Sequence, residues 1–172
     1  MCILIFTRIN MIITTQLFVF FTVFGCIVYA AETPYKACNP DDPIYKNIEM
    51  LSSHCNSTPC PFKRGSNVTL SASFIPEETH SKMYTIMYFD LNGVKVNYEV
   101  EHRVNVCNHI FSHPDKVKVG CPIQKGKRYI FERTVYVLPN VPKLPKVVVH
   151  WAIRDHDTKK DIVCYDILVK IV

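Results

Sequence analysis

The side chains with the widest chemical range lie between residues 102 and 121. His102, Cys107, His109, His113 and Cys121 offer imidazole nitrogens and thiolates, which are the ligands that zinc prefers. Their spacing does not match the paired Cys and His arrangement of a structural zinc site, and in an oxidising compartment thiols pair with each other first. The sequence therefore predicts no metal and no cofactor here.

Groups suited to nucleophilic or acid–base catalysis are present but scattered. No Gly-x-Ser-x-Gly sequence occurs, and His150 lies beside Trp151 in an alternating stretch, where a hydrogen-bonded structural histidine is expected. Asp155, Asp157 and Asp161 share one charged stretch with the composition of a solvated turn. We therefore expect that the protein is not an enzyme.

Large apolar side chains are more numerous than a small two-layer protein needs. The set is Val68, Leu70, Met87, Tyr98, Val137, Val149, Trp151, Tyr165 and Ile167. These side chains either fill a close-packed core or line a space for an apolar ligand, and spacing alone does not separate the two.

Short strands are the elements that must position these side chains. Within 147–153 and again within 163–171 an apolar residue recurs at every second position, and the stretch 155–161 between them is charged. This pattern predicts two antiparallel strands joined by a solvated turn. Such an apolar hairpin is not stable alone in water and requires a second sheet against it.

The rest of the chain shows the same organisation. Further strands are expected over 44–55, 67–74, 83–91 and 127–137. Asn92-Gly93 is a strong hairpin signal that leads into another strand, whereas 99–120 is expected to be irregular. Many short strands without alternating helices predict an all-β sandwich.

The bulk composition fits one globular domain, with 172 residues of which 48% are hydrophobic. The formal net charge of +5 is modest. No dense stripe of Lys and Arg with interleaved aromatic residues occurs, so the composition argues against nucleic-acid binding.

The N-terminus indicates the compartment. Arg8 precedes an apolar run over 12–28, and the small-residue pattern Val-Tyr-Ala ends at Ala30. Residues 1–30 are therefore predicted to be a secretory signal, cleaved after Ala30, which leaves a domain over 31–172. A membrane anchor is the alternative, but polar residues within the run disfavour it.

Six cysteines remain after such cleavage: Cys38, Cys55, Cys60, Cys107, Cys121 and Cys164. An even number in an exported chain implies disulfides, and six cysteines allow about fifteen connectivities.

Asn67-Val-Thr is an acceptor sequence for N-glycosylation, and Asn56-Ser-Thr is a poorer one because Pro59 follows it.

Three stretches carry a resemblance to a known family: CPIQKGKRY at 121–129, KVVVHWAIRD at 146–155 and VCYDILVKIV at 163–172. Together they resemble the Niemann-Pick type C2 family of secreted sterol carriers, which have the ML (lipid-recognition) domain. The combination is specific, although no single stretch is. The likeness extends upstream through CNSTPC at 55–60 and Asn-Gly-Val at 92–94, so it covers nearly all of the predicted mature chain.

The resemblance implies an immunoglobulin-like β-sandwich of two antiparallel sheets with a lipid cavity between them. It also implies three disulfides, Cys38–Cys164, Cys55–Cys60 and Cys107–Cys121. The first would tie the N-terminus of the mature chain to its final strand.

In this family a sterol lies between the sheets with its hydroxyl near the mouth. By position, the residues of the inner lining would be Val68, Leu70, Met87, Val149, Trp151, Tyr165 and Ile167. The residues at the mouth would be Tyr98, Val137, Val141 and Pro142. This sequence departs from the family in three places. Tyr165 stands where relatives often have tryptophan, 94–107 lacks the prolines of the family's entrance segment, and the loop 107–121 is longer.

The resemblance thus implies a monomeric carrier, secreted or in the endosomal–lysosomal lumen, that delivers a sterol or related apolar lipid to membranes or a membrane sterol transporter. The basic residues expected to attract an anionic membrane surface are Lys125, Lys127, Arg128, Lys143 and Lys146. Two alternatives remain at this point. One is an innate-immune lipid co-receptor or semiochemical binder of the same fold, and the other is a structural sandwich with a filled core.

Overall fold

The computed structural model describes residues 34–42 and 48–172. The predicted signal over 1–30 and residues 43–47 lie outside the described part. No helix in the described residues is long and apolar enough to cross a membrane.

The described chain forms ten strands and one short 3₁₀ helix, η2. Their bounds are β1 Tyr35–Ala37, β2 Glu49–Ser52, β3 Cys60–Phe62, β4 Asn67–Phe74, β5 Met83–Leu91, β6 Val94–Asn97, η2 Cys107–His109, β7 Ile110–Ser112, β8 Tyr129–Tyr136, β9 Leu144–Asp155 and β10 Asp161–Ile171.

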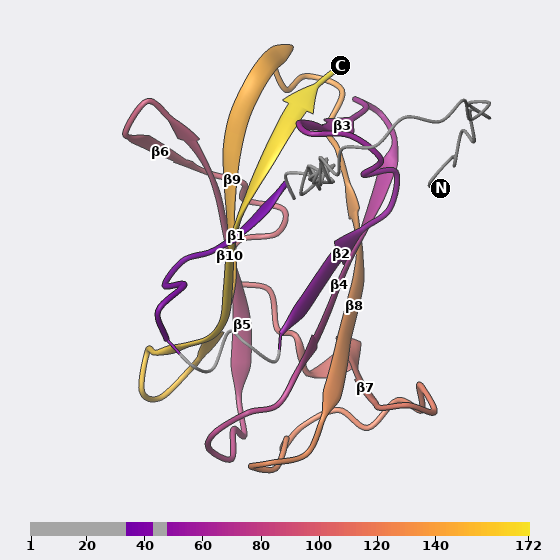
Figure 1. Ribbon diagram of the computed structural model, residues 1–172, viewed down its shortest axis with the longest axis vertical. Coiled ribbons are helices and arrows are strands. Elements are labelled where there is room, and N and C mark those ends of the chain that lie inside the picture. The colour runs from indigo at the N-terminus through magenta and orange to yellow at the C-terminus, as the bar shows by residue number, and fades with distance from the viewer. Residues whose placement is uncertain (1–33, 43–47) are drawn as a thin grey trace, which may run out of the picture. The chain divides into compact units, whose positions relative to one another are not determined.

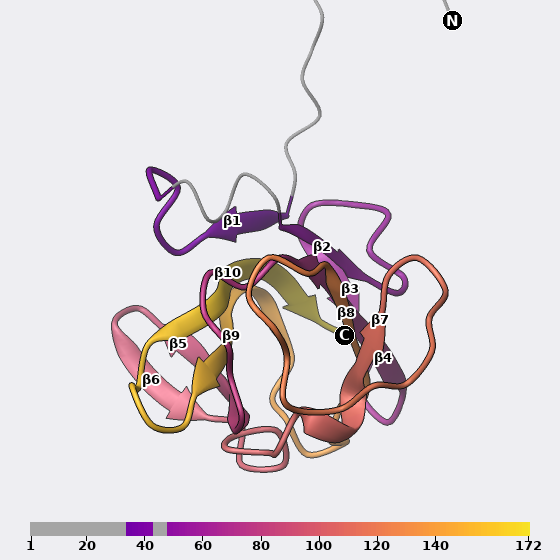
Figure 2. The same ribbon diagram turned by 90° about the horizontal axis from the view of Figure 1, so that it is seen from below.

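These strands form two sheets that face each other (Figures 1 and 2). The first has the order β1-β10-β9-β5-β6, with β3 also paired to β10, and the second has the order β2-β4-β8-β7. Every strand pairing is antiparallel except that of β3 with β10, which is parallel. The predicted all-β, immunoglobulin-like sandwich is therefore confirmed, with β3 as one departure from a purely antiparallel arrangement.

The β9–β10 hairpin is the centre of the first sheet. Trp151 pairs with Tyr165 across the hairpin and with Met87 of β5 on its other side, so three large side chains lie in one row on the inner face. Val149 and Ile167 form the next pair on the inner face of the hairpin. The alternation seen in the sequence thus places one apolar face toward the second sheet, as predicted.

Some short strands differ from the prediction. The strand expected over 44–55 is confined to Glu49–Ser52 among the described residues, and the stretch 99–120, expected to be irregular, contains η2 and β7. β1 and β3 were not predicted either. These strands have three or four residues, too few for alternation to be visible, and pairing with β10, β4 or β8 defines them.

Three disulfides connect the described cysteines in the pattern that the resemblance implied, Cys38–Cys164, Cys55–Cys60 and Cys107–Cys121. The first holds β1 against β10, where Ala37 pairs with Tyr165. The third closes the loop that contains η2 and β7. The second closes the stretch CNSTPC on itself.

Asp155 fixes the turn between β9 and β10. Its Oδ1 accepts hydrogen bonds from the backbone N–H groups of Asp157 and Thr158 and from the Thr158 hydroxyl, and its Oδ2 lies 2.8 Å from His80 Nδ1. Burial raises the pKa of Asp155, but these hydrogen bonds outweigh it and lower the pKa to about 2.

Breaking the Cys38–Cys164 disulfide should cost more stability than breaking Cys55–Cys60. The cross-links span 126 and 5 residues, so the chain-entropy model gives losses of at most about 5 and about 2 kcal/mol. Urea unfolding of Cys38→Ser/Cys164→Ala and of Cys55→Ser/Cys60→Ala measures both. Equal losses would contradict the role assigned to the long-range cross-link.

The unfolding free energy should fall as the pH is lowered from about 4 to about 2. The folded-state pKa of Asp155 is depressed, so its contribution of about 2 kcal/mol is complete above the unfolded value and is lost as the pH falls through about 2. Asp155→Asn should remove this pH dependence in urea titrations, whereas Asp157→Asn, at an exposed position, should leave it unchanged. Identical pH profiles for wild type and Asp155→Asn would contradict this interpretation.

Candidate functional site

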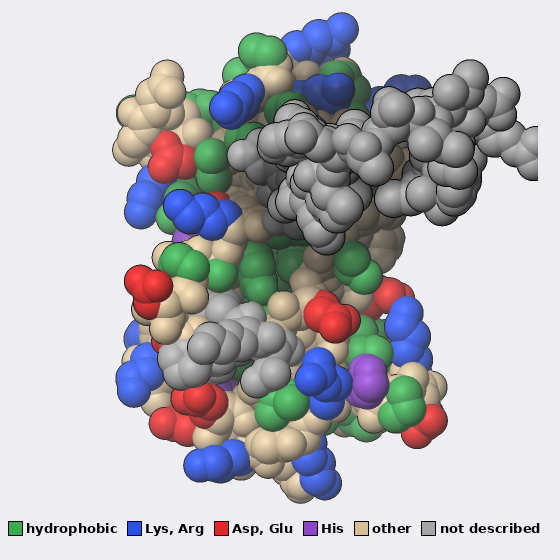
Figure 3. Space-filling model, viewed as in Figure 1, with side chains coloured by type: hydrophobic (Ala, Val, Ile, Leu, Met, Phe, Trp, Pro, Cys, Tyr) green, Lys and Arg blue, Asp and Glu red, His purple; other side chains and the backbone are tan. Residues whose placement is uncertain are grey.

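Apolar side chains from both sheets pack together in the layer between them. All the residues predicted to form the inner lining are at most 7% exposed and belong to one continuous core cluster. They are Val68 and Leu70 on β4, Met87 on β5, Val149 and Trp151 on β9, and Tyr165 and Ile167 on β10. Figure 3 shows hydrophobic side chains at the surface between the two sheets, near the middle of the face in view.

Two tyrosine hydroxyls bridge the sheets at the margins of this apolar layer. Tyr98 O–H donates to the Tyr136 carbonyl at 2.6 Å and accepts from the Leu138 N–H at 3.0 Å. Tyr165 O–H donates to the Ile48 carbonyl at 3.1 Å. Burial raises the pKa of both phenols, so they stay neutral donors over the physiological range. The two polar atoms are thus satisfied without a charge in the apolar layer.

An apolar groove of about 300 Å³ opens at one edge of the sandwich. One wall is the end of the β5–β6 hairpin with the segment that follows it, and the other is the connection between β8 and β9. Of the predicted mouth residues, Tyr98, Val141 and Pro142 line this groove. Val137 is 5% exposed and lies in the core cluster, so the structure places it inside rather than at the mouth.

Aromatic contact joins the two sheets deeper in the layer. The ring of Phe131 on β8 lies 5.2 Å, centroid to centroid, from that of Trp151 on β9. Both side chains are at most 2% exposed. The sheets therefore touch at Trp151, whereas the groove opens at the edge formed by Phe89 and Leu144.

One inward-facing position carries a charge. Arg133 pairs with Leu70 and therefore shares its face of the sheet. Its guanidinium forms two hydrogen bonds to Glu101, which is 5% exposed, at 2.5 and 3.1 Å, and a third contact of 2.7 Å to His109 Nε2. Burial and then the charge of Arg133 lower the pKa of His109, which favours a neutral ring that accepts the Arg133 hydrogen bond. This paired cluster forms a polar wall at one side of the apolar layer.

The structure separates the residues that had suggested a zinc site. Cys107 and Cys121 form a disulfide, His109 contacts Arg133, and His113 lies exposed on its loop. His102 lines a depression on the outer face of the first sheet, and its buried Nδ1 atom has no hydrogen-bond partner among the described residues.

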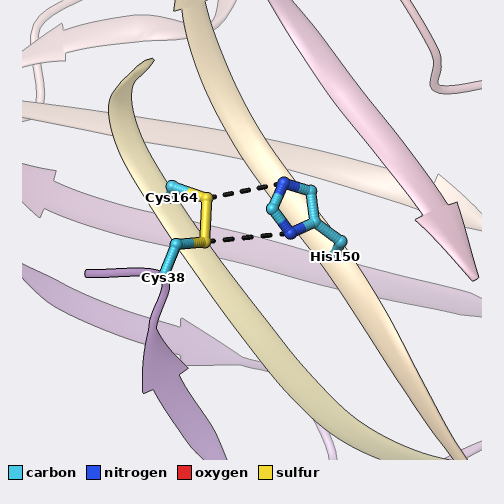
Figure 4. A group of neighbouring side chains, drawn as sticks. All are labelled: Cys38, His150 and Cys164. Atoms are coloured by element: carbon cyan, nitrogen blue, oxygen red, sulfur yellow. Dashed lines mark hydrogen bonds between the residues drawn. A yellow bond between two sulfur atoms is a disulfide. The ribbon is translucent and has the colours of Figure 1, made fainter. Parts of the chain in front are cut away.

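Another cysteine–histidine group lies on the outer face of the first sheet. His150 Nδ1 is 3.8 Å from Cys38 Sγ, and its Nε2 is 3.5 Å from Cys164 Sγ (Figure 4). The two sulfurs share a disulfide, so neither is a thiolate that would bind a metal. His150 Nδ1 also lies 2.9 Å from Asp166, and its ring stacks on Tyr88. His150 thus has structural partners, as its position beside Trp151 had suggested.

The carboxylates near the last turn have separate partners. Asp161 binds Arg154 through two hydrogen bonds of 2.6 and 3.0 Å, and Asp157 lies 3.0 Å from His156 at the surface. With Asp155 holding the turn, each of the three carboxylates has a different local partner.

The predicted membrane-facing cations fall into two groups. Lys125, Lys127 and Arg128 precede β8, whereas Lys143 and Lys146 follow it. An eight-residue strand separates the groups by roughly 25 Å. Figure 3 shows basic side chains at both ends of the molecule. Lys143 lies between the groove residues Pro142 and Leu144, and Lys146 lies further along β9.

Several groove and wall residues were not predicted. They are Phe89, Leu91, Val96, Glu101, Arg133, Leu138 and Leu144. Phe89 continues the inward alternation of Met87 along β5, so periodicity alone would have found it. Glu101 lies outside the strands and Arg133 breaks an apolar alternation, so sequence patterns gave no sign that they meet.

Comparison with known proteins decides the family, because the sequence model of the ML domain matches residues 32–171. The chain belongs to the ML domain family. Mouse NPC intracellular cholesterol transporter 2 is 26% identical to this ML domain over 139 residues, covering 80% of this chain and 83% of the relative. Its Drosophila melanogaster homolog a is 24% identical over 148 residues, covering 84% and 91%.

Solved structures support the same fold. A Niemann-Pick type C2 protein from Japanese carpenter ant superposes with a TM-score of 0.59 at 22% identity, covering 72% of this chain and 89% of that protein. Chicken MD-1, in a complex with lipid IVa, superposes with a TM-score of 0.52 at 17% identity, covering 79% and 86%.

Tyr98→Phe should lower the unfolding free energy of this ML domain by about 1–2 kcal/mol. The substitution leaves the Tyr136 carbonyl and the Leu138 N–H without their shared partner at a site where Tyr98 is 6% exposed. Urea unfolding measures the loss. Tyr136→Phe is the matched control, because its side chain is 47% exposed, and it should change stability by less than about 0.5 kcal/mol. Equal effects would argue against the bridging role of Tyr98.

Proposed function

We propose that this ML domain binds a sterol, or another apolar lipid of similar size, between its two sheets and transfers it to a membrane or an acceptor protein. The observation that carries the proposal is an apolar layer lined by both sheets, with an open apolar groove at its edge. The names of the mouse and fly relatives, which specify cholesterol, support a sterol as the first ligand to test. This function requires no bond to be made or broken.

We assign the ligand contacts in two zones. The inner zone consists of Val68, Leu70, Met87, Val137, Val149, Trp151, Tyr165 and Ile167. The mouth consists of Tyr98, Val141 and Pro142, together with the groove residues Phe89, Leu138 and Leu144. A ligand hydroxyl at the mouth would meet the Tyr98 phenol and the backbone around it.

Entry of a ligand must involve movement of the two groove walls. A volume of about 300 Å³ is at the lower limit of small-molecule pockets. Burial of about 400 Å² of apolar area would gain about 10 kcal/mol, and association costs about 4–15 kcal/mol. The balance is at most about 6 kcal/mol, a moderate affinity that suits a carrier which must also release its ligand.

Several features support an exported carrier. Three disulfides form in the described chain, and Asn56 and Asn67 are both exposed, as glycan attachment requires. With the predicted signal over 1–30, they favour the secreted or endosomal–lysosomal compartment. For delivery, Lys143 lies between the groove residues Pro142 and Leu144, and exposed apolar residues such as Val96 line the groove, which would suit contact with an anionic membrane.

Lipid recognition within a receptor complex is the second candidate. It is favoured by the likeness to a tobacco hornworm (Manduca sexta) MD-2-related lipid-recognition protein, which is 22% identical over 149 residues. For this function, lipid A rather than sterol would be the preferred ligand.

A fluorescent sterol tests the proposal directly. Purified mature protein should take it up saturably, cholesterol should displace it, and lipid A should compete at least tenfold less well. Preferential competition by lipid A would favour the second candidate. If neither lipid bound, the core would be a filled one and the carrier proposal would be wrong.

Val141→Asp should weaken sterol uptake at least tenfold. A carboxylate in the apolar groove wall would lose hydration each time a sterol enters. The same fluorescence titration measures this change. Val119→Asp introduces the same charge at a 48% exposed position in the loop 107–121 and should bind as the wild type does. Equal affinities for all three proteins would exclude the groove as the entrance.

A further inference from the structure

A basic hollow lies on the outer face of the first sheet, away from the apolar layer. It consists of two adjoining depressions of about 440 and 510 Å³ that share Tyr84 and Arg103. Tyr84 and Tyr88 of β5 alternate with the inward-facing Met83 and Met87 and so point to this outer side. The basic hollow is therefore distinct from the proposed sterol site.

The lining of the basic hollow is strongly cationic. Its cations are Lys82, Lys95, Arg103, Arg154 and Lys159, and no aspartate or glutamate of the described chain lines either depression. Arg154 is neutralised by Asp161. The other four form no ion pair with any described residue. Like charges gathered in a concave surface concentrate a positive potential that an anion would relieve.

Three of these cations lie over tyrosine rings. Lys95 Nζ lies 5.0 Å from the centre of the Tyr88 ring, and His150 stacks on the same tyrosine at 4.4 Å. Arg103 and Lys159 lie 5.8 and 5.7 Å from the centre of the Tyr84 ring. A ligand therefore meets ammonium, guanidinium and imidazole groups rather than open aromatic faces.

The backbone that carries Arg103 is fixed to β5. Arg103 has a left-handed φ of 60°, and its N–H donates to the Thr85 carbonyl at 2.7 Å. The Thr85 N–H in turn donates to the Val104 carbonyl at 2.9 Å. The neighbouring His102, which lines the larger depression, has a buried Nδ1 atom with no partner in the described chain. The backbone of Arg103 is thus positioned before any ligand arrives.

We propose that the basic hollow binds an extended sulfated polysaccharide. One sulfated unit would contact Lys82 and Lys159 in the first depression, and another Lys95 and Arg103 in the second. The chemistry disfavours other polyanions. Nucleic-acid bases need open aromatic faces for stacking, and a folded protein partner needs an apolar centre, whereas cations and an imidazole already lie over the two tyrosines.

The test measures the affinity of the mature protein for a size-defined heparin oligosaccharide by calorimetry at several salt concentrations. Lys82→Gln/Lys159→Gln and Lys95→Gln/Arg103→Gln should each weaken binding at least tenfold and lower the slope of log K against log salt by about two. The matched control is Lys125→Gln/Lys127→Gln, which removes the same charge from exposed positions before β8 and should change affinity less than twofold.

Two kinds of result would overturn the proposal. One is an equal loss in the control pair, or a loss in only one of the two hollow pairs, because a chain across both depressions requires both. The other is equally tight binding of desulfated heparin, polyglutamate or a single-stranded oligonucleotide. Sterol uptake should be unchanged in all of these variants, so the outcome is independent of the proposed carrier function.

Discussion

Burial of the apolar inner faces of two sheets is the constraint on which the rest of the structure depends. The β9–β10 hairpin alone presents Val149, Trp151, Tyr165 and Ile167 to the opposite sheet. Exposing these apolar side chains to water would be unfavourable, so the hairpin needs the second sheet to cover them. The remaining features serve this contact. The Cys38–Cys164 disulfide holds an added edge strand on β10, and the phenols of Tyr98 and Tyr165 satisfy backbone groups at the margins.

The same constraint separates the functions that different surfaces can perform. Alternation along β5 sends Met87 and Phe89 inward to the apolar layer and Tyr84 and Tyr88 outward to the basic hollow. The outer face thus offers cationic groups and the inner layer offers apolar ones, so the two ligands that we propose would bind on opposite faces of the first sheet. Asn97 on β6 lines both the groove and the basic hollow, so this hairpin is where the two surfaces meet.

Sequence patterns predicted the parts of the fold that depend on periodicity. The strand expected over 67–74 matches β4, and the last hairpin lies where alternation placed it, because a buried face repeats every second residue. The resemblance supplied the disulfide pairs. β1, β3 and β7 were not predicted, because these short strands form only by pairing with β10 or β8, which are distant in the sequence. For the same reason the Glu101–Arg133 pair was missed, since an arginine in an apolar alternation gives no sign of the carboxylate that neutralises it.

Photo-cross-linking with a diazirine sterol, mapped by mass spectrometry, tests most directly whether a lipid enters between the sheets. The labels should fall on inner residues of both sheets, such as Leu70 on β4 and Val149 on β9, and on Tyr98 at the mouth, and excess cholesterol should abolish them. Labels confined to the outer faces, or unaffected by cholesterol, would show that the apolar layer is a closed core.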